Sequence, residues 1–560
     1  MTGRPFAWEK SYPPGITWDD PIRTSAIPDL FDKAVADFGP RRVIEYRGVD
    51  LTYEALGRMV DKAAAGFLRG GIGRDTTLAV YLPNTPYHPI AFFGGLKTGA
   101  RLVMLSPLDA ERELAYKLKD SGARTLVTTD IGEMLPMAMR LLEAGHLDRV
   151  IVGEDSAWGA PPIPVAPVPD DPRVVRWPDY VRGSQIPTDW PAVTTDDIAV
   201  LQYTGGTTGL PKGAILSHGN LTAATSIYET WFEGQHLSAP GEDKVVCVLP
   251  LFHIYALTTI LLRQIKSGNE ILLRLRFDVD TSLRDIEELR ATVFLGVPTM
   301  WIAIANAPGI EKRDLSSLRY CGSGGAPLPV ETGRRFRNLT GHRLLGGWGM
   351  TETSPAGTNL PAHGPEKHGS IGVPMPAIEM GVVALEDPTR VLPAGETGEL
   401  RIRGPNVTRG YWNRPEETDN AFADGYFLTG DIGYMDEDGF FYIVDRKKDM
   451  ILSGGFNVYP QVIEQAIYEH PAVAEVLVIG VEDAYRGQSA KAFVTLRPQA
   501  SPFTIEELQA FLTDKVGKHE MPKDLEFRDA LPRTVVGKLS KIALREEERA
   551  KRASGSQVAS

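Results

Sequence analysis

A short polar segment, residues 203–214, contains four glycines, three threonines and one lysine directly after an apolar stretch at 198–202. Glycines allow backbone N–H groups to approach a phosphate closely. The hydroxyls of Thr207 and Thr208 can donate further hydrogen bonds, and Lys212 adds a positive charge. The segment therefore predicts a loop that grips a triphosphate.

This loop differs from the common Gly-x-x-x-x-Gly-Lys-Ser/Thr phosphate-binding motif. Counted from Gly206, Pro211 stands where the second glycine belongs, and Gly213 stands where the magnesium-binding hydroxyl belongs. An ordinary glycine-rich hairpin is the alternative interpretation of such a segment. The density of small, polar, phosphate-compatible residues favours the binding loop.

Six further motifs follow in order after this loop. Each places glycine, charged or aromatic residues in a short segment that can contact a ligand. They are residues 249–253 (LPLFH), 323–328 (SGGAPL), 346–352 (GGWGMTE), 429–431 (TGD), 445–448 (DRKK) and 532–538 (PRTVVGK).

Taken together, the seven motifs resemble those of the acyl-adenylate-forming superfamily, over roughly residues 30 to 545. The segment 445–460 looks most like bacterial medium- and long-chain fatty-acyl-CoA synthetases. The resemblance implies an AMP-forming acid–CoA ligase that uses ATP, Mg²⁺ and coenzyme A. Such an enzyme first forms acyl-AMP and pyrophosphate and then transfers the acyl group to coenzyme A.

The resemblance also assigns roles to individual residues. Glu352 and Thr207 would hold Mg²⁺, a cation that prefers oxygen ligands, and Thr351 would bind the α-phosphate. Trp348 offers a face for adenine, and Asp431 could accept both ribose hydroxyls. The residues expected to bind ATP are Thr204, Gly205, Gly206, Thr207, Thr208, Lys212, Gly325, Ala326, Pro327, Gly347, Trp348, Gly349, Met350, Thr351, Asp431, Arg446 and Lys538.

Lys538 is the predicted adenylation catalyst, beside Thr351, Glu352 and His253. Its ammonium would stabilise charge that grows on the carboxylate and the α-phosphate in the transition state. Relatives use one active site twice, by rotating a small C-terminal domain about a hinge. The resemblance places that hinge at Lys448 and the coenzyme A contacts at Ser453, Gly454 and Gly455.

The acid is less well defined by the motifs. Amino-acid-loading relatives carry an Asp for the α-amino group, and residues 249–253 contain no acidic residue. Small residues at Gly324 and Gly347 are expected to leave room for a long or broad chain. A medium- to long-chain fatty acid is the first choice, followed by dicarboxylates such as pimelate and by aryl acids. The predicted acyl pocket consists of His253, Ile254, Leu257, Gly324 and Gly347.

Two other classes of function remain open at this stage. A non-catalytic nucleotide-binding protein could share the motifs, although the simultaneous presence of Lys212, Glu352, Asp431, Arg446 and Lys538 counts against it. A luciferase-like oxygenase would share all adenylation residues. The turn at 532–538 also resembles sequences that are acetylated on the catalytic lysine, which would remove the charge of Lys538.

Composition agrees with a cytoplasmic enzyme. The formal net charge of −12 argues against a nucleic-acid partner. The first ten residues lack the apolar core of a signal peptide, and no apolar stretch is long enough to span a membrane. Cys247 and Cys321 lie in apolar segments and are expected to be buried free thiols. Peripheral membrane contact and a homodimer are left open.

The chain has 560 residues, which is more than a single hydrophobic core usually supports, so more than one domain is expected. The alternation of apolar strands and helices between the motifs predicts an α/β protein. Strands are expected at 78–82, 101–105, 125–128 and 149–152, with helices at 51–68 and 110–120 between them. The predicted organisation is a large α/β domain (1–445) that includes a β-rich subdomain, a hinge (446–449) and a small mobile α+β domain (450–560).

Overall fold

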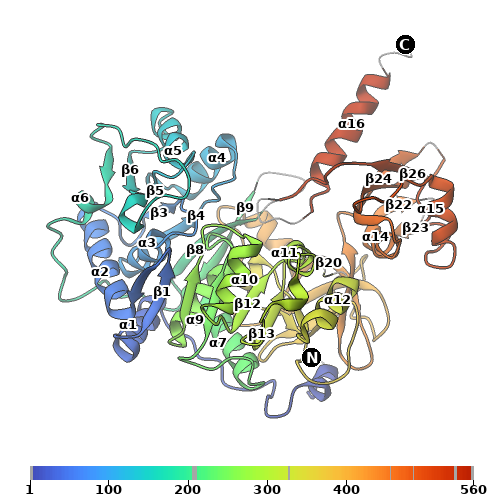
Figure 1. Cartoon of the computed structure of the whole chain (residues 1–560), viewed down its shortest axis with the longest axis horizontal. Coiled ribbons are helices and arrows are strands. Elements are labelled where there is room, and N and C mark those ends of the chain that lie inside the picture. Colours follow the sequence, from blue (N-terminus) through green and yellow to red (C-terminus); the bar gives the residue numbers. More distant parts are fainter. Residues whose placement is uncertain are drawn as a thin grey trace.

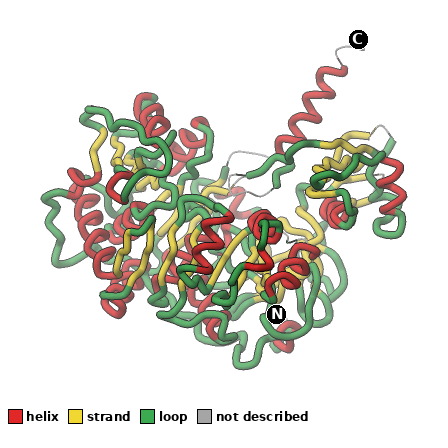
Figure 2. Tube along the Cα trace, viewed as in Figure 1, coloured by secondary structure: helices red, strands yellow, loops and turns green. Residues whose placement is uncertain are grey.

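The computed structural model describes residues 4–204, 211–325, 328, 330–453, 456–483, 485–534 and 539–556. A large body carries the first part of the chain, and a smaller body lies beside it (Figure 1). Helices flank the strands in both bodies (Figure 2). The α/β class predicted from the sequence is confirmed.

In the part of the chain that the structure describes, the first sheet has seven strands in the order β7-β6-β5-β3-β4-β8-β9 and is parallel except for β9. Its central strands are buried along their whole length, as expected for parallel strands with helices on both faces. The strands are β3 (Thr77–Val80), β4 (Arg101–Met104), β5 (Thr125–Thr129), β6 (Arg149–Gly153), β7 (Val174–Arg176), β8 (Ile198–Thr204) and β9 (Lys212–Ser217).

The second sheet is larger, and the relative direction of its neighbouring strands changes from parallel to antiparallel along its length. From β1 to β14 its neighbours are parallel, and from β14 onward they are antiparallel. The antiparallel part is the predicted β-rich subdomain. The parallel part comprises β1 (Arg42–Tyr46), β10 (Lys244–Cys247), β11 (Glu270–Leu273), β12 (Val293–Gly296), β13 (Tyr320–Ser323) and β14 (Leu344–Trp348), with β2 (Val49–Thr52) antiparallel at its edge.

The antiparallel part continues directly from β14 in the order β15-β16-β21-β20-β18-β17. It is therefore not a separate sheet. Its strands are β15 (Thr358–Asn359), β16 (Ser370–Pro374), β17 (Glu379–Val383), β18 (Gly398–Arg403), β19 (Phe422–Ala423), β20 (Tyr426–Met435) and β21 (Phe441–Arg446).

Helices cover these sheets and begin where the sequence supplies a cap. Thr52 accepts a hydrogen bond from the Ala55 N–H, so the helix predicted from residue 51 begins at residue 53. The helices of the large body are α1 (Ile27–Phe38), α2 (Tyr53–Arg69), α3 (Tyr87–Lys97), α4 (Glu111–Ser121), α5 (Met134–Glu143), α6 (Trp177–Val181), α7 (His218–Glu233), α8 (Ile254–Ala256), α9 (Arg263–Lys266), α10 (Val279–Glu287), α11 (Pro298–Ala305), α12 (Val330–Thr340) and α13 (Pro415–Asp419).

Among the described residues, five short helical segments of other types complete the large body. The most unusual one is a π-helix, η3, which links α8 to α9. The segments are η1 (Ala7–Ser11), η2 (Asp155–Trp158), η3 (Leu257–Leu262), η4 (Ile310–Lys312) and η5 (Thr351–Thr353).

The small body has its own sheet and its own hydrophobic core. Thr504 and Glu507 form the predicted capping box, with Thr504 accepting from the Glu507 N–H at 3.2 Å. The last helix, α16, extends away from the rest (Figure 1). The elements are β22 (Ile451–Ser453), β23 (Phe456–Val458), β24 (Val473–Asp483), β25 (Gly487–Leu496), β26 (Asp524–Phe527), α14 (Pro460–Tyr468), α15 (Ile505–Leu512) and α16 (Ile542–Ser556).

The main core of the large body contains side chains from both of its sheets, including Leu78 and Val80 on β3 and Val245 on β10. Cys247 and Cys321 are buried free thiols, as predicted. Burial raises the pKa of both thiols. They are therefore poor nucleophiles.

Candidate functional site

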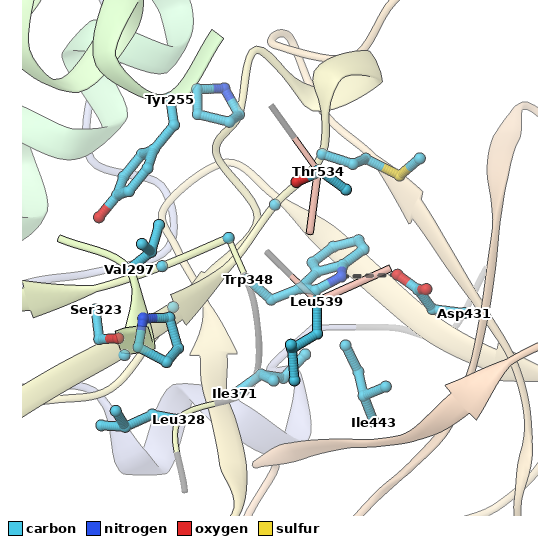
Figure 3. A pocket seen from close by; sticks show the side chains of 18 of the residues that line it. Tyr255, Val297, Ser323, Leu328, Trp348, Ile371, Asp431, Ile443, Thr534 and Leu539 are labelled. Carbon is cyan, nitrogen blue, oxygen red and sulfur yellow. Dashed lines mark hydrogen bonds between the residues drawn. The ribbon is translucent and has the colours of Figure 1, made fainter. Parts of the chain in front are cut away.

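A cleft of about 2890 Å³ lies between the large and the small body. Residues from most of the predicted motifs line it, although they come from distant parts of the chain. Figure 3 shows one part of the cleft, with Trp348 and Asp431 beside Thr534 and Leu539 of the small body. The motifs therefore meet in one place.

A hydrogen bond and an ion pair join Trp348, Asp431 and Arg446, which lie at the end of β14, within β20 and at the end of β21. The Trp348 Nε1–H donates to Asp431 Oδ2 at 2.8 Å (Figure 3), and Arg446 Nε lies 2.5 Å from Asp431 Oδ1. Asp431 on β20 and Arg446 on β21 are direct cross-strand partners. Burial raises the pKa of the Asp431 carboxyl, while the Arg446 charge acts in the opposite direction.

Glu352 lies on η5, immediately after β14, and its side chain is buried. The Tyr411 hydroxyl donates to Glu352 Oε1 at 2.8 Å. Burial raises the pKa of Glu352, because a carboxylate loses its hydration there. The Lys212 ammonium lies 5.1 Å from the centre of the Tyr411 ring, so this tyrosine joins the glycine-rich segment to Glu352.

The glycine-rich segment is flanked by paired strands. Thr204 at the end of β8 and Lys212 at the start of β9 face each other across the antiparallel pair, and both line the cleft. The expected polar turn is therefore shorter than 203–214, since its two ends belong to strands. Gly205, Gly206, Thr207 and Thr208 lie outside the described residues.

The remaining nucleotide motifs surround the same part of the cleft. Gly325, Gly347, Gly349, Met350 and Thr351 line it. A side chain at Gly349 would place its Cβ 1.4 Å from the Pro355 carbonyl oxygen, so only glycine fits this close approach. Ala326 and Pro327 lie outside the described residues.

The predicted acyl pocket needs two corrections. His253 and Ile254 line the cleft, but Leu257 does not, since it is fully buried in the main core. Leu257 is the first residue of the π-helix η3, and Thr259 of the same segment lines the cleft in its place.

The second correction concerns the space beside the glycines. A Cβ at Gly324 would lie 2.8 Å from the Tyr255 ring, and one at Gly347 would lie 2.6 Å from the Thr358 carbonyl oxygen. Both glycines line the cleft, yet their missing side chains accommodate a close neighbour. They do not provide the free space expected for a long chain.

Sequence reasoning missed the aromatic side chains that line this part of the cleft. Tyr228 and Phe232 are one helical turn apart on α7 and stack with ring centres 5.7 Å apart. Phe232 also packs on Tyr320 of β13 at 4.7 Å. The spacing of four residues on α7 was the available signal. Tyr255, two residues after His253, completes the group and is labelled in Figure 3.

From the small body, Thr534 and Leu539 line the cleft close to Trp348 (Figure 3). Lys538, the predicted catalyst, lies outside the described residues, as do Gly454 and Gly455. Ser453 is buried at the end of β22 and is not among the described residues that line the cleft. Lys448 is exposed in the connection between β21 and β22 and does line it.

No group of three or more acidic, histidine or cysteine side chains that could hold a metal ion occurs among the described residues. A Mg²⁺ that is bound through substrate phosphates needs only one or two protein carboxylates. The buried Glu352 carboxyl beside Lys212 and Tyr411 is compatible with such a site.

Two family models match the chain. The model described as AMP-binding enzyme covers residues 31–412, and the model described as AMP-binding enzyme C-terminal domain covers residues 462–538. The chain belongs to the AMP-binding enzyme family. Its membership accounts for the order of the motifs around the cleft.

Relatives within the AMP-binding enzyme family include proteins named for different acids. A long-chain-fatty-acid–CoA ligase of Bacillus subtilis is 37% identical over 97% of this chain and 98% of its own length. A feruloyl-CoA synthase of an Amycolatopsis species is 37% identical over 90% of this chain and 95% of its own. The anthranilate CoA ligase AuaEII, solved with anthranoyl-AMP, superposes with a TM-score of 0.84 at 25% identity, covering 95% and 99% of the two chains.

In the described part of the chain, no helix is long and apolar enough to cross a membrane.

Proposed function

We propose that this protein is an AMP-forming acid–CoA ligase that activates a long-chain fatty acid. The observation that carries the proposal is the convergence of Trp348, Asp431, Glu352 and Lys212 in one cleft. A buried acceptor for ribose, an aromatic face and a phosphate-binding segment fit ATP. The fatty-acid substrate is favoured by the name of the Bacillus subtilis relative and its near-complete overlap with this chain.

In the adenylation step, the substrate carboxylate attacks the α-phosphate and pyrophosphate leaves in line. Such a step depends on positioning and on neutralising negative charge. Asp431 would fix the ribose, Thr351 the α-phosphate, and Lys212 the leaving phosphates. When bound, Mg²⁺ supplies further neutralisation, and Glu352 with Thr207 would hold it.

Lys538 would bridge the substrate carboxylate and the α-phosphate as this charge develops. Support comes from its described neighbours, since Thr534 and Leu539 on either side line the cleft close to Trp348. In the second step, residues 450–560 would rotate about 446–449, and Ser453, Gly454 and Gly455 would approach coenzyme A. The two family models lie on either side of this hinge, which agrees with the proposed division.

An aryl acid is the second candidate. The side chains of Tyr228, Phe232, Tyr255 and Tyr320 surround the inner part of the cleft and suit an aromatic ring as well as an alkyl chain. The feruloyl-CoA synthase relative favours the same class. The dicarboxylate alternative gains no comparable support from these side chains.

Three further proposals concern the protein in the cell: a cytoplasmic location, a homodimer and acetylation of Lys538. Acetylation would remove the charge that adenylation needs. If adenylation proceeds unchanged in protein acetylated stoichiometrically at this lysine, the switch is excluded.

The test of the proposed function is ATP–pyrophosphate exchange across linear acids, α,ω-diacids, benzoates and cinnamates, followed by detection of the CoA thioester. We expect exchange and thioester formation with long linear acids. Lys538→Ala should lower exchange by on the order of 10²–10³-fold while thiolysis of supplied acyl-adenylate continues. Equal loss in both half-reactions would contradict the role of Lys538, and the absence of exchange with every acid would contradict the function.

A further inference from the structure

Two charged groups of the proposed ATP site come from different sheets. Lys212 begins β9 of the first sheet, and Glu352 follows β14 of the second. Strand pairing within one sheet therefore does not set the distance between them. A third segment, residues 408–412 between β18 and α13, contacts both groups.

The segment 408–412 is fixed to β9 through its backbone. The Ile215 N–H donates to the Gly410 carbonyl oxygen at 3.0 Å. Ala214 and Tyr411 form an isolated antiparallel bridge beside this hydrogen bond. The segment is therefore held against the strand that contains Lys212 at its start.

The same segment holds Glu352 at both its backbone and its side chain. The Thr408 N–H donates to the Glu352 carbonyl oxygen at 2.7 Å, and the Tyr411 hydroxyl donates to Glu352 Oε1 at 2.8 Å. Glu352 is 5% exposed, so water does not readily replace a lost donor. The orientation of the Glu352 carboxylate therefore depends on Tyr411.

Tyr411 is anchored at the wall of the cleft and contacts both charged groups. Its N–H donates to Thr418 Oγ1 at 2.9 Å, and its side chain lines the cleft. Its hydroxyl contacts Glu352, while the Lys212 ammonium lies 5.1 Å from the centre of its ring. A cation at this distance from an aromatic face is attracted by the ring. One side chain thus connects the two groups.

We propose that Tyr411 is a positioning residue that orients the Glu352 carboxylate for a divalent cation bound with ATP. The proposal rests on the proposed function, because it assumes that Glu352 holds this cation. A hydrogen-bond partner of a metal ligand fixes the orientation of that ligand, and its removal typically lowers metal affinity about 10- to 100-fold. The ring of Tyr411 has a second role, which is to hold Lys212 beside the same site.

Two substitutions separate the hydroxyl from the ring. Tyr411→Phe removes the donor to Glu352 and keeps the ring beside Lys212, whereas Tyr411→Leu removes both. The probe is Mn²⁺, titrated in the presence of ATP and followed by its electron paramagnetic resonance signal. Binding of ATP alone is measured separately, in the presence of a chelator.

We expect Tyr411→Phe to weaken Mn²⁺ binding on the order of 10- to 100-fold. Its affinity for ATP without a divalent cation should stay close to wild type, because the ring and Lys212 are unchanged. Tyr411→Leu should weaken both kinds of binding. The Mg²⁺ concentration that gives half-maximal pyrophosphate exchange should rise in parallel with the Mn²⁺ dissociation constant.

Tyr426 offers a matched control in the antiparallel part of the second sheet. Its hydroxyl donates to Glu379 Oε2 at 2.7 Å, and its ring lies 4.1 Å from the guanidinium of Arg401. Neither Tyr426 nor Glu379 is among the described residues that line the cleft. Tyr426→Phe removes the same kind of hydrogen bond and should leave Mn²⁺ binding unchanged.

Three outcomes would overturn the proposal: unchanged Mn²⁺ affinity in Tyr411→Phe, an equal loss of metal-free ATP binding in that variant, or the same loss of Mn²⁺ affinity in Tyr426→Phe. If Tyr411→Phe does not fold, Thr418→Val replaces it, because this change removes the acceptor of the Tyr411 N–H. Thr418→Val should then weaken Mn²⁺ binding, and unchanged affinity would overturn the proposal.

The same measurements distinguish this inference from the proposed function. Unchanged Mn²⁺ affinity in Tyr411→Phe, beside a wild-type protein that forms CoA thioesters, would refute the inference alone. A wild-type protein that binds Mn²⁺ with ATP but forms no thioester with any acid would refute the proposed function alone.

Discussion

Replacing Trp348 by Phe tests whether its indole N–H orients Asp431 for ATP. The substitution keeps an aromatic face in the cleft and removes the 2.8 Å hydrogen bond to Asp431 Oδ2. Asp431 is 1% exposed, so water does not readily replace the lost donor. Arg446 still contacts Oδ1, but its side chain is 44% exposed and therefore holds the carboxylate less firmly.

A hydrogen bond to a charged group contributes about 1.5–3 kcal/mol. If Asp431 binds the ribose, part of this energy is lost from ATP binding. We expect KM for ATP to rise on the order of tenfold, which corresponds to about 1.4 kcal/mol, with a smaller change in kcat. Initial rates of pyrophosphate exchange at varied ATP and saturating acid measure both constants.

Trp301 provides the matched control. Its Nε1–H donates to the Gly322 carbonyl at 3.0 Å, it is 1% exposed, and it does not line the cleft. Trp301→Phe should lower the melting temperature about as much as Trp348→Phe does, because each substitution removes one buried hydrogen bond. It should leave KM for ATP unchanged. If Trp348→Phe lowers the melting temperature to the same extent and leaves KM for ATP unchanged, the Trp348 indole has only a structural role and the reasoning is wrong.

Two further predictions concern Glu352 and Tyr255. Glu352→Gln should abolish most exchange activity yet raise the melting temperature at about pH 8, because the raised pKa of Glu352 gives the wild-type protein stability that is lost as pH rises through the folded pKa. At about pH 4 the carboxyl is protonated in the folded wild-type protein, so the two proteins should melt alike. A lower melting temperature of the variant at both pH values would refute this. Gly324→Ala should lower kcat/KM, because its Cβ would lie 2.8 Å from the Tyr255 ring, and a Tyr255→Ala background should restore it; additive losses in the double variant would contradict that contact.

That the motifs would meet in one cleft could be predicted from the sequence, because they lie in or directly after buried strands and follow one another in a fixed order. Trp348 ends β14, and Glu352 follows four residues later. What the sequence did not reveal is that Asp431 and Arg446 neutralise each other, since this depends on the register between β20 and β21. Tyr411 was missed for the same reason, because its contact with Glu352 joins residues that are 59 positions apart.

The acyl half was predicted less well. Leu257 was assigned to the pocket by the family resemblance, but it is fully buried in the core, and Thr259 of the same π-helix lines the cleft instead. A π-helix replaces the regular i→i+4 hydrogen bonds, so helical spacing does not give the direction of its side chains. The aromatic side chains that line the cleft lie outside the motifs, and only the spacing of Tyr228 and Phe232 on α7 indicated them.

The two glycines show why the identity of the acid does not follow from the motifs. A glycine beside a substrate can leave space for the substrate, or it can allow another group of the protein to pack closely. The residue type alone does not distinguish these two cases. At Gly324 the neighbour is the Tyr255 ring, and at Gly347 it is the backbone of β15. The shape of the acyl site is therefore set by side chains that no motif specifies, above all Tyr255 and the stacked pair on α7. Proteins that share every nucleotide residue can for this reason differ in their acid, as the fatty-acid and feruloyl relatives do by name.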